Sequence, residues 1–221
     1  MAGSVIAIDG PAASGKSTIA VALARRLHRL HLNTGAMYRA FTVKVLRAGL
    51  RLDERDAIVR LLDETTVELR PDGRGDVRVL LDGEDVTAEV GTPEVSRLVS
   101  PVSLMPEVRA FMVRAQRRLA DAYDIVAEGR DVTTVVFPDA RYKFYLDASP
   151  DERAQRRLKE FESRGETVTL DEVKRELAER DHRDSTRELS PLTRADDAAV
   201  VDTTAMTPDE VVAHIMDMIE P

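Results

Sequence analysis

Short apolar runs alternate with longer stretches of helical periodicity along this 221-residue chain. Apolar runs of about four to eight residues are typical of buried strands, whereas apolar residues three and four positions apart indicate a helix with one buried face. The alternation predicts an α/β fold with a parallel sheet. The expected strands are residues 4–9, 30–33, 125–128, 142–147 and 198–202.

Three segments have the sequence signature of a helix start, a hydroxyl residue followed by glutamate three positions later. In such a capping box the hydroxyl accepts a hydrogen bond from the third helical amide, and the glutamate accepts one from the amide of the capping residue. The boxes are expected at Ser149, Thr169 and Thr207. The apolar residues that follow the third box predict a C-terminal helix packed on the core: Val211, Ile215 and Met218.

Residues 67–86 interrupt this pattern, because apolar and polar residues alternate there with a period of two. The turn signals are Pro71-Asp72-Gly73 and Asp82-Gly83, of which the second is typical of a two-residue hairpin turn. The segment predicts a small antiparallel sheet inserted into the main fold. A surface hairpin that has no part in the function stays as the alternative interpretation at this point. The alternating apolar positions are Val67, Leu69, Val77, Val79, Leu81 and Val86.

The composition is that of an ordinary globular protein, with 43% hydrophobic and 33% charged residues. Lys and Arg number 32 against 40 Asp and Glu, a net charge of −8, so we expect no nucleic-acid partner. No apolar run reaches the roughly 18 residues of a membrane-spanning helix, and we expect no membrane partner. The sequence MAGSVIAIDG lacks the features of a signal peptide, which favours a cytoplasmic location. A monomer is expected, because no strand edge or helix shows an apolar patch.

The chain has no cysteine, which excludes disulfides, thiolate metal sites and cysteine nucleophiles. The four histidines do not have the spacing of metal ligands. We expect them on the surface or behind the functional site: His28, His31, His182 and His214.

Residues 10–17, GPAASGKS, match the P-loop pattern G-x-x-x-x-G-K-[ST] between an apolar strand and an amphipathic helix. The glycines let the backbone approach phosphate oxygens, so that amide N–H groups and the helix N-terminus face the anion. Lys16 would reach the β- and γ-phosphates of a nucleoside triphosphate, and the Ser17 hydroxyl would bind Mg²⁺. The expected nucleotide-binding residues are Gly10, Pro11, Ala12, Ala13, Ser14, Gly15, Lys16, Ser17 and Thr18. The following helix is expected to have an apolar face at Ile19, Leu23, Leu27 and Leu30.

The rest of the chain narrows the class of P-loop protein. A GTPase needs an Asn-Lys-x-Asp guanine reader, but Asn33 is the only asparagine in the sequence and Thr34 follows it. A motor or transporter ATPase usually has a much longer chain. These observations favour a small enzyme that transfers a phosphoryl group to a small acceptor.

Arginines and carboxylates occur together in four polar segments without helical periodicity. Transfer of a phosphoryl group between two anions needs cations, and arginine binds phosphate in a bidentate way that lysine cannot match. Taken singly, an arginine is more often a solvated surface charge than a phosphate ligand. Together, after a P-loop, the arginines indicate a second phosphate site. The segments are 34–39, 128–131, 153–157 and 180–187.

Five motifs extend over nearly the whole chain: IAIDGPAASGKST, NTGAMYRA, VAEGRDVTTVVFPDA, KFYLDAS and AERDHRDSTRELSPL. Together they resemble the bacterial cytidylate kinases, a family of nucleoside monophosphate kinases. The resemblance implies a P-loop NTPase fold with a five-stranded parallel core sheet, helices on both faces, an inserted small antiparallel sheet and a short helical lid. It also implies transfer of the γ-phosphate of ATP, with Mg²⁺, to CMP or dCMP.

The resemblance also implies a division of the chain into functional parts. The P-loop core would comprise 1–33, 101–152 and 181–221, the monophosphate-binding subdomain 34–100 and the lid 153–180. The antiparallel segment would then belong to the enlarged monophosphate-binding region.

The resemblance assigns roles residue by residue. The implied catalytic residues are Lys16, Glu128, Arg130, Arg153 and Arg157. The lid residues implied to bind the ATP phosphates are Arg156 and Arg157. Arg39 and Arg130 would hold the acceptor phosphate, with Thr34 and Tyr38 beside it. The residues implied to read cytosine are Ser100, Arg109, Asp131 and Arg187, and those near the ribose and phosphate are Arg180 and Asp184.

Two positions depart from the family pattern. Thr133 stands where the family commonly has glycine, and a β-branched residue there would be strained if the site needed a positive φ. Glu128 stands where some members have aspartate, which keeps the carboxylate but makes it one methylene longer.

Hydrogen-bonding chemistry gives a reason for the choice of base. A carboxylate such as Asp131 can accept from the cytosine amino group, while arginine or serine donors meet the ring acceptors. Uracil reverses this pattern, at a cost of about 1–3 kcal/mol per mismatched group, so UMP is expected to be a poor acceptor.

Two alternatives remain at this point. The chain could be a P-loop kinase for a different nucleotide or a shikimate-like acceptor, or a non-catalytic ATP-binding module. The intact Lys16, Ser17 and arginine set argue against the second.

Overall fold

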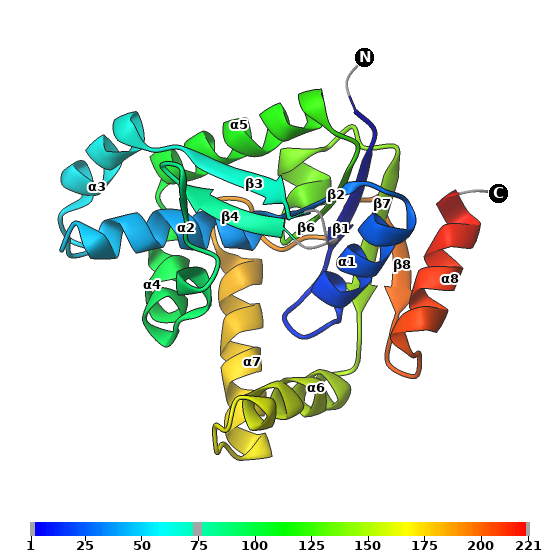
Figure 1. The fold of residues 1–221 in the computed structure, drawn as a ribbon. Coiled ribbons are helices and arrows are strands. Elements are labelled where there is room, and N and C mark those ends of the chain that lie inside the picture. Colours follow the sequence, from blue (N-terminus) through cyan, green and yellow to red (C-terminus); the bar gives the residue numbers. More distant parts are fainter. Residues whose placement is uncertain (1–2, 73–76, 220–221) are drawn as a thin grey trace. The chain divides into compact units, whose positions relative to one another are not determined.

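The computed structural model describes residues 3–72 and 77–219. Within them, one five-stranded sheet has the order β2-β6-β1-β7-β8 and one three-stranded sheet has the order β3-β4-β5 (Figure 1). Strand β1 pairs in parallel with β7, and β7 with β8, whereas the small sheet is antiparallel. The predicted α/β fold with a parallel core sheet and an inserted antiparallel sheet is confirmed.

The chain divides into two compact units, which are described separately below. The P-loop unit comprises Val5–His28 and Val126–Pro221, and the middle unit comprises Met1–Ser4 and Arg29–Ile125. The elements formed wholly or mainly by the P-loop unit are β1 Val5–Asp9, α1 Lys16–Arg26, β6 Ile125–Gly129, η3 Val132–Val136, β7 Tyr142–Asp147, α6 Pro150–Ser163, α7 Leu170–Thr186, β8 Ala199–Asp202 and α8 Pro208–Ile219. Those of the middle unit are β2 Leu30–Asn33, α2 Thr34–Arg47, α3 Arg55–Leu61, η1 Leu62–Glu64, β3 Val67–Pro71, β4 Val77–Leu81, β5 Glu84–Asp85, η2 Glu89–Gly91, α4 Pro93–Ser103 and α5 Pro106–Ala122.

Helices α1 and α8 pack against the strands of the P-loop unit, and Figure 1 shows the two helices side by side. Ile6 and Ile8 of β1 are fully buried, as is Leu23 of α1. The predicted packing of the C-terminal helix is confirmed, since Ile215 is buried in the same core. Buried strand side chains therefore hold β1, and with it the start of the P-loop, against a rigid layer of helices.

The helix after the P-loop is shorter than its apolar spacing indicates. It ends at Arg26, and Leu30 is the first residue of β2 rather than part of the helical face. His28 has a φ of +53°, a left-handed conformation that ends the helix and turns the chain. The expectation that Leu30 belongs to this helix was therefore wrong.

The capping boxes at Thr169 and Thr207 are confirmed. At Thr169 the hydroxyl accepts from the amide of Glu172 at 3.3 Å, and the Glu172 carboxylate accepts from the amide of Thr169 at 2.8 Å. The same reciprocal pair joins Thr207 and Glu210. Both helix starts satisfy amide groups that would otherwise be unpaired.

The capping box predicted at Ser149 is only half formed. The Ser149 hydroxyl accepts from the amide of Glu152 at 3.2 Å, but the Glu152 carboxylate pairs with Arg156 instead of returning to Ser149. The Ser149 amide donates to the Thr204 hydroxyl at 2.9 Å. Tertiary partners have replaced the local one at this helix start.

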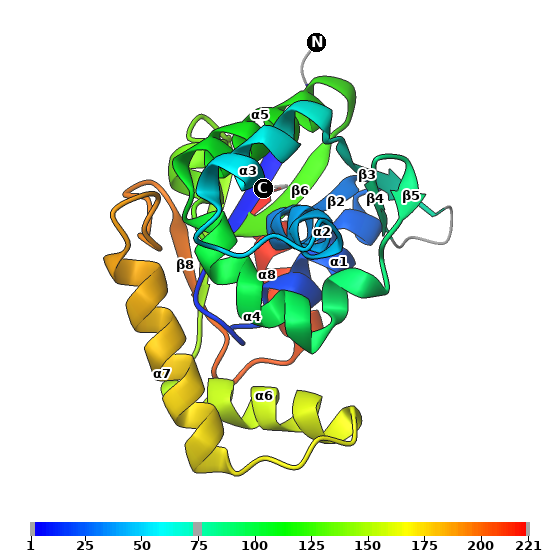
Figure 2. The same ribbon diagram turned by 90° about the vertical axis from the view of Figure 1, so that its left-hand side faces the viewer.

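Helices α6 and α7 follow each other in the chain and contact each other, and Figures 1 and 2 show α6 lying crosswise to α7. The apolar faces of the two helices meet at Ala154, Val173 and Leu177, and Ala12 of the P-loop lies in the same buried cluster. The α6–α7 pair therefore packs directly on the phosphate-binding loop.

In the middle unit, the β3–β4 hairpin packs on α2. Lys44 of α2 forms an ion pair with Asp82 at 2.7 Å. Asp82 and Gly83 both have positive φ, +52° and +85°, which confirms the predicted hairpin turn between β4 and β5. Gly73 of the other predicted turn lies outside the described residues.

Within residues 3–72 and 77–219, no helix combines the length and the apolar character needed to cross a lipid bilayer.

Candidate active site

The loop of residues 10–17 joins buried strand β1 to helix α1. A Cβ atom on Gly10 would lie 2.0 Å from the carbonyl oxygen of Leu146, so only glycine fits between the loop and β7. Gly15 has a φ of +91°, a conformation that side chains rarely adopt. Close packing at Gly10 and the positive φ at Gly15 therefore favour glycine at these two positions.

Lys16, the first residue of α1, is buried against the loop. Its Nζ donates to the carbonyl oxygen of Pro11 at 2.5 Å and to the Ser14 hydroxyl at 3.4 Å. Burial lowers the pKa of Lys16 well below its usual value, and the positive charge of Arg130 lowers it further, while Glu128 acts in the opposite direction. A phosphate anion placed here would raise the pKa of Lys16 again, because its negative charge favours the charged lysine and offsets the charge of Arg130.

Ser17 and Glu128 bring two oxygen ligands together next to Lys16. The Ser17 hydroxyl donates to Glu128 Oε2 at 2.8 Å, and Glu128 is a buried residue near the end of β6. Hydroxyl and carboxylate oxygens are ligands of the kind that Mg²⁺ prefers. The pair therefore fits the cation that accompanies a nucleoside triphosphate.

Arg130 follows at the end of β6. Its Nε donates to Asp184 of α7 at 2.9 Å, and one terminal nitrogen donates to the Gly129 carbonyl oxygen at 3.3 Å. Arg180, one turn earlier on α7, also acts electrostatically on Lys16. The P-loop unit thus places two predicted cations, Arg130 and Arg180, within electrostatic range of Lys16.

Arg187 lies just past the end of α7, where its Nε donates to the Ser190 carbonyl oxygen at 2.6 Å. The Asp184 carbonyl oxygen accepts from the Leu192 amide at 2.7 Å, which folds the chain after α7 back onto the helix. These contacts hold Arg187 close to the end of the helix that carries Arg180 and Asp184.

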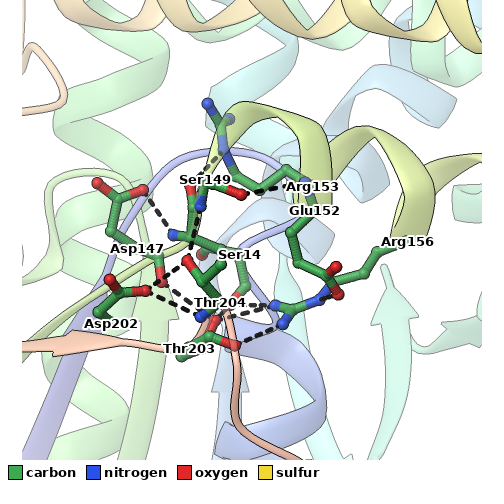
Figure 3. A network of polar contacts seen from close by, with 10 residues as sticks. Ser14, Asp147, Ser149, Glu152, Arg153, Arg156, Asp202, Thr203 and Thr204 are labelled. Carbon is green, nitrogen blue, oxygen red and sulfur yellow. Dashed lines mark hydrogen bonds and ion pairs between the residues drawn. The ribbon is translucent and has the colours of Figure 1, made fainter.

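Two of the predicted lid arginines hold α6 on the P-loop. Arg153 donates to the Ala148 and Ala12 carbonyl oxygens, both at 3.2 Å, and forms an ion pair with Asp181 of α7. Arg156 donates to the hydroxyl and the carbonyl oxygen of Thr203, at 2.9 and 2.6 Å (Figure 3).

The Arg156 contacts continue into the loop itself. The Thr203 hydroxyl donates to the Ser14 carbonyl oxygen at 3.2 Å, and Arg156 also reaches that oxygen, at 3.5 Å. Thr203 was not foreseen from the sequence, because its partners are distant in the chain.

The third predicted lid arginine, Arg157, contacts other residues of α6. Its guanidinium lies over the Phe161 ring, 4.5 Å from the ring centre, and forms an ion pair with Glu160.

Asp9 is a second residue that the sequence did not single out. Its carboxylate is fully buried and accepts hydrogen bonds from the Val132 amide at 3.0 Å and the Thr133 amide at 2.7 Å. The Thr133 hydroxyl donates to the same carboxylate at 2.7 Å. Burial raises the pKa of Asp9, although the hydrogen bonds from Thr133 and Val132 lower it in part.

The possible strain at Thr133 does not occur. Thr133 lies in the helical turn η3, and it is not among the described residues with positive φ. A β-branched residue is therefore compatible with the backbone at the position where the family commonly has glycine.

The middle unit carries five predicted site residues on three helices that contact one another, α2, α4 and α5. Arg39 donates to the Val90 carbonyl oxygen at 3.1 Å and to the Ser96 hydroxyl at 2.8 Å. The Arg109 guanidinium lies 5.5 Å from the centre of the Tyr38 ring, a cation–π distance. Thr34 is buried at the first position of α2, and Ser100 is half-buried on α4.

Comparison with known proteins explains why these groups occur in one chain. The family model described as cytidylate kinase matches residues 6–221. The chain belongs to the cytidylate kinase family.

Relatives in the family match along almost the whole chain. The "Cytidylate kinase" of Carboxydothermus hydrogenoformans is 47% identical over 214 residues, which cover 97% of this chain and 96% of the relative. That of Caldanaerobacter subterraneus subsp. tengcongensis is 47% identical over 97% of this chain and 93% of the relative. A solved structure titled "Crystal structure of TT1252 from Thermus thermophilus" is similar with a TM-score of 0.47 and 20% identity, covering 100% of this chain and 98% of that one.

Proposed function

We propose that this chain is an ATP-dependent kinase that transfers the γ-phosphate of ATP to CMP or dCMP, giving ADP and CDP or dCDP. The observation that carries the proposal is the cationic cluster around Lys16 in a chain that belongs to the cytidylate kinase family. Burial and the charges of Arg130 and Arg180 disfavour a charged Lys16 more than Glu128 and Asp9 favour it, and a triphosphate supplies further negative charge.

The donor nucleotide would bind the loop of residues 10–18. Lys16 would contact the β- and γ-phosphates, and Arg156 and Arg157 would bind the phosphates from α6. Mg²⁺ would be held by the Ser17 hydroxyl and the Glu128 carboxylate, where it would offset phosphate charge. These contacts follow the usual logic of phosphoryl transfer, in which positioning and charge do most of the work.

The acceptor would bind predicted residues that lie outside the loop of residues 10–18. Arg39 and Arg130 would hold its phosphate beside Thr34 and Tyr38, because guanidinium groups match phosphate geometry. Arg180 and Asp184 would lie near the ribose and phosphate. The cytosine would be read by Ser100, Arg109, Asp131 and Arg187.

The transfer needs no covalent intermediate and no general base, because the acceptor phosphate is already an anion at neutral pH. Lys16, Arg130, Arg153 and Arg157 would offset the charge that develops on the transferred group. We assign residues 153–180 as the lid, 34–100 as the monophosphate-binding subdomain, and 1–33, 101–152 and 181–221 as the core. Closure of the lid would exclude water that could otherwise hydrolyse ATP.

A coupled assay for ADP release tests the proposal, with CMP, dCMP, UMP, AMP and shikimate offered separately. CMP or dCMP should be phosphorylated, with kcat/KM at least about tenfold above that for UMP. Arg130→Ala should lose about 10²–10³-fold in kcat/KM for CMP, whereas Arg114→Ala, an exposed arginine on α5, should match the wild type. A higher kcat/KM for UMP, AMP or shikimate than for CMP and dCMP would contradict the proposed acceptor.

We further propose that the enzyme acts as a monomer in the cytoplasm, on nucleotides and without nucleic-acid or membrane partners. The net charge of −8 supports the expectation for nucleic acid. Light scattering on the purified chain should give the mass of one copy; the mass of a dimer would contradict this.

A further inference from the structure

Asp9 connects the start of the P-loop to the segment that follows β6. It is the last residue of β1, immediately before Gly10, and its side chain is fully buried. Within the described residues it accepts three hydrogen bonds, two from the backbone amides of Val132 and Thr133 and one from the Thr133 hydroxyl. Both carboxylate oxygens are therefore in use, so Asp9 is not placed to take a proton from a substrate.

The partners of Asp9 begin an unusual helical turn. Residues Val132–Val136 form η3, a π-helical turn, and the amides of Val135 and Val136 both bond to the Asp131 carbonyl oxygen. The first amides of a helix have no partner within it, and Asp131 makes no side-chain cap. Asp9 supplies the cap from a strand more than a hundred positions earlier in the sequence. Such turns occur frequently at functional sites.

A second contact holds the other end of the same segment. Glu128 accepts from the Ser17 hydroxyl at 2.8 Å. The segment between Glu128 and Thr133 is therefore attached to the P-loop region at both ends. Arg130 and Asp131, which are proposed to bind the acceptor phosphate and the base, lie between the two attachments.

We propose that Asp9 and Thr133 act as positioning residues for the acceptor, fixing Arg130 and Asp131 relative to the P-loop. This inference rests on the proposed function. A displacement of about 1 Å at such groups can cost about a hundredfold in rate, so the anchor has a direct bearing on catalysis. The Thr133 hydroxyl strengthens the anchor in a way that a glycine at this position could not.

Substitutions at Thr133 separate this role from the charge of Asp9, which also acts on Lys16. Thr133→Val has nearly the same shape and removes only the hydroxyl donor, whereas Thr133→Ser keeps it. Thr134→Val is the matched control, because Thr134 is the next residue of η3 and is less buried, and the described hydrogen bonds to the Asp9 carboxylate come from Val132 and Thr133 instead.

Steady-state kinetics with ATP and CMP, together with the CMP-to-UMP ratio of kcat/KM, test the proposal. Thr133→Val should raise KM for CMP about three- to tenfold and lower the CMP-to-UMP ratio, with KM for ATP within about twofold of wild type. Thr133→Ser should restore both values, and Thr134→Val should behave as wild type. Asp9→Asn should have a larger effect, about thirtyfold or more on KM for CMP, because an amide NH₂ would face a backbone N–H.

Thermal unfolding of each variant distinguishes positioning from folding. If Thr133→Val lowers stability while all kinetic constants stay at wild-type values, the anchor is structural only and the proposal is wrong. Equal increases in KM for ATP and CMP would also overturn it. If the wild type does not phosphorylate CMP, the proposed function fails instead, and the same variants are measured with the acceptor that the wild type does use.

Discussion

The Arg153→Met substitution tests how α6 is fastened to the P-loop. Arg153 is 8% exposed, and it joins Ala148, Ala12 and Asp181 through its guanidinium group. Methionine keeps much of the aliphatic bulk but none of the donors. Within the described residues, Asp181 Oδ1 is buried and has no hydrogen-bond partner. The substitution would also remove the partner of Asp181 Oδ2, which is Arg153.

The expected loss of stability follows from this geometry. Removing one partner of a buried ion pair lowers the free energy of unfolding by about 3–5 kcal/mol. The Asp181 side chain is 23% exposed, so water solvates part of the carboxylate and the expected loss falls below that range, to about 2–3 kcal/mol. For a chain of this length that corresponds to a fall in Tm of roughly 5–10 °C.

Thermal and urea unfolding followed by circular dichroism measure the effect. Arg51→Met is the matched control, because Arg51 pairs with Asp53 on the surface and both side chains are largely exposed; its Tm should not change measurably. The double variant Arg153→Met/Asp181→Leu should regain part of the lost stability, since no uncompensated carboxylate remains. If Arg153→Met unfolds at the wild-type midpoint and loses only turnover, the guanidinium acts on phosphate alone and the reasoning is refuted.

Three further outcomes are expected. Burial and Arg130 lower the pKa of Lys16 in the folded chain. Between that lowered pKa and 10.5, Lys16 is therefore less protonated in the folded chain than in the unfolded chain. The free energy of unfolding should rise with pH in this range. Lys16→Met should remove this slope in urea titrations at several pH values and lose about 10²–10³-fold in kcat; an unchanged slope would contradict the burial argument. Thr169→Ala should cost about 1 kcal/mol by removing the cap of α7, measured by the urea midpoint, and an effect near zero would show that the cap is dispensable. Ser17→Ala should raise the Mg²⁺ concentration needed for half-maximal rate about tenfold, whereas an unchanged Mg²⁺ titration would argue against Ser17 as a ligand.

Local patterns in the sequence determined much of this protein. The strands, the P-loop and the boxes at Thr169 and Thr207 depend on residues that are neighbours in the chain, so periodicity and spacing reveal them. The Asp82-Gly83 turn belongs to the same group, because its backbone conformation is set by two adjacent residues. The resemblance of the motifs indicated the family, which the family match confirmed.

Only the tertiary structure decided which hydrogen bonds form between residues that are far apart in the sequence. Ser149 has the signature of a full capping box, but Arg156 and Thr204 provide competing partners and the local pair does not form. The contact between Asp9 and Thr133 spans 124 positions, a separation at which no local pattern carries a signal. A hydrogen bond needs its two atoms within about 3 Å, and only the packing of buried strands against helices brings residues so far apart in sequence to that distance.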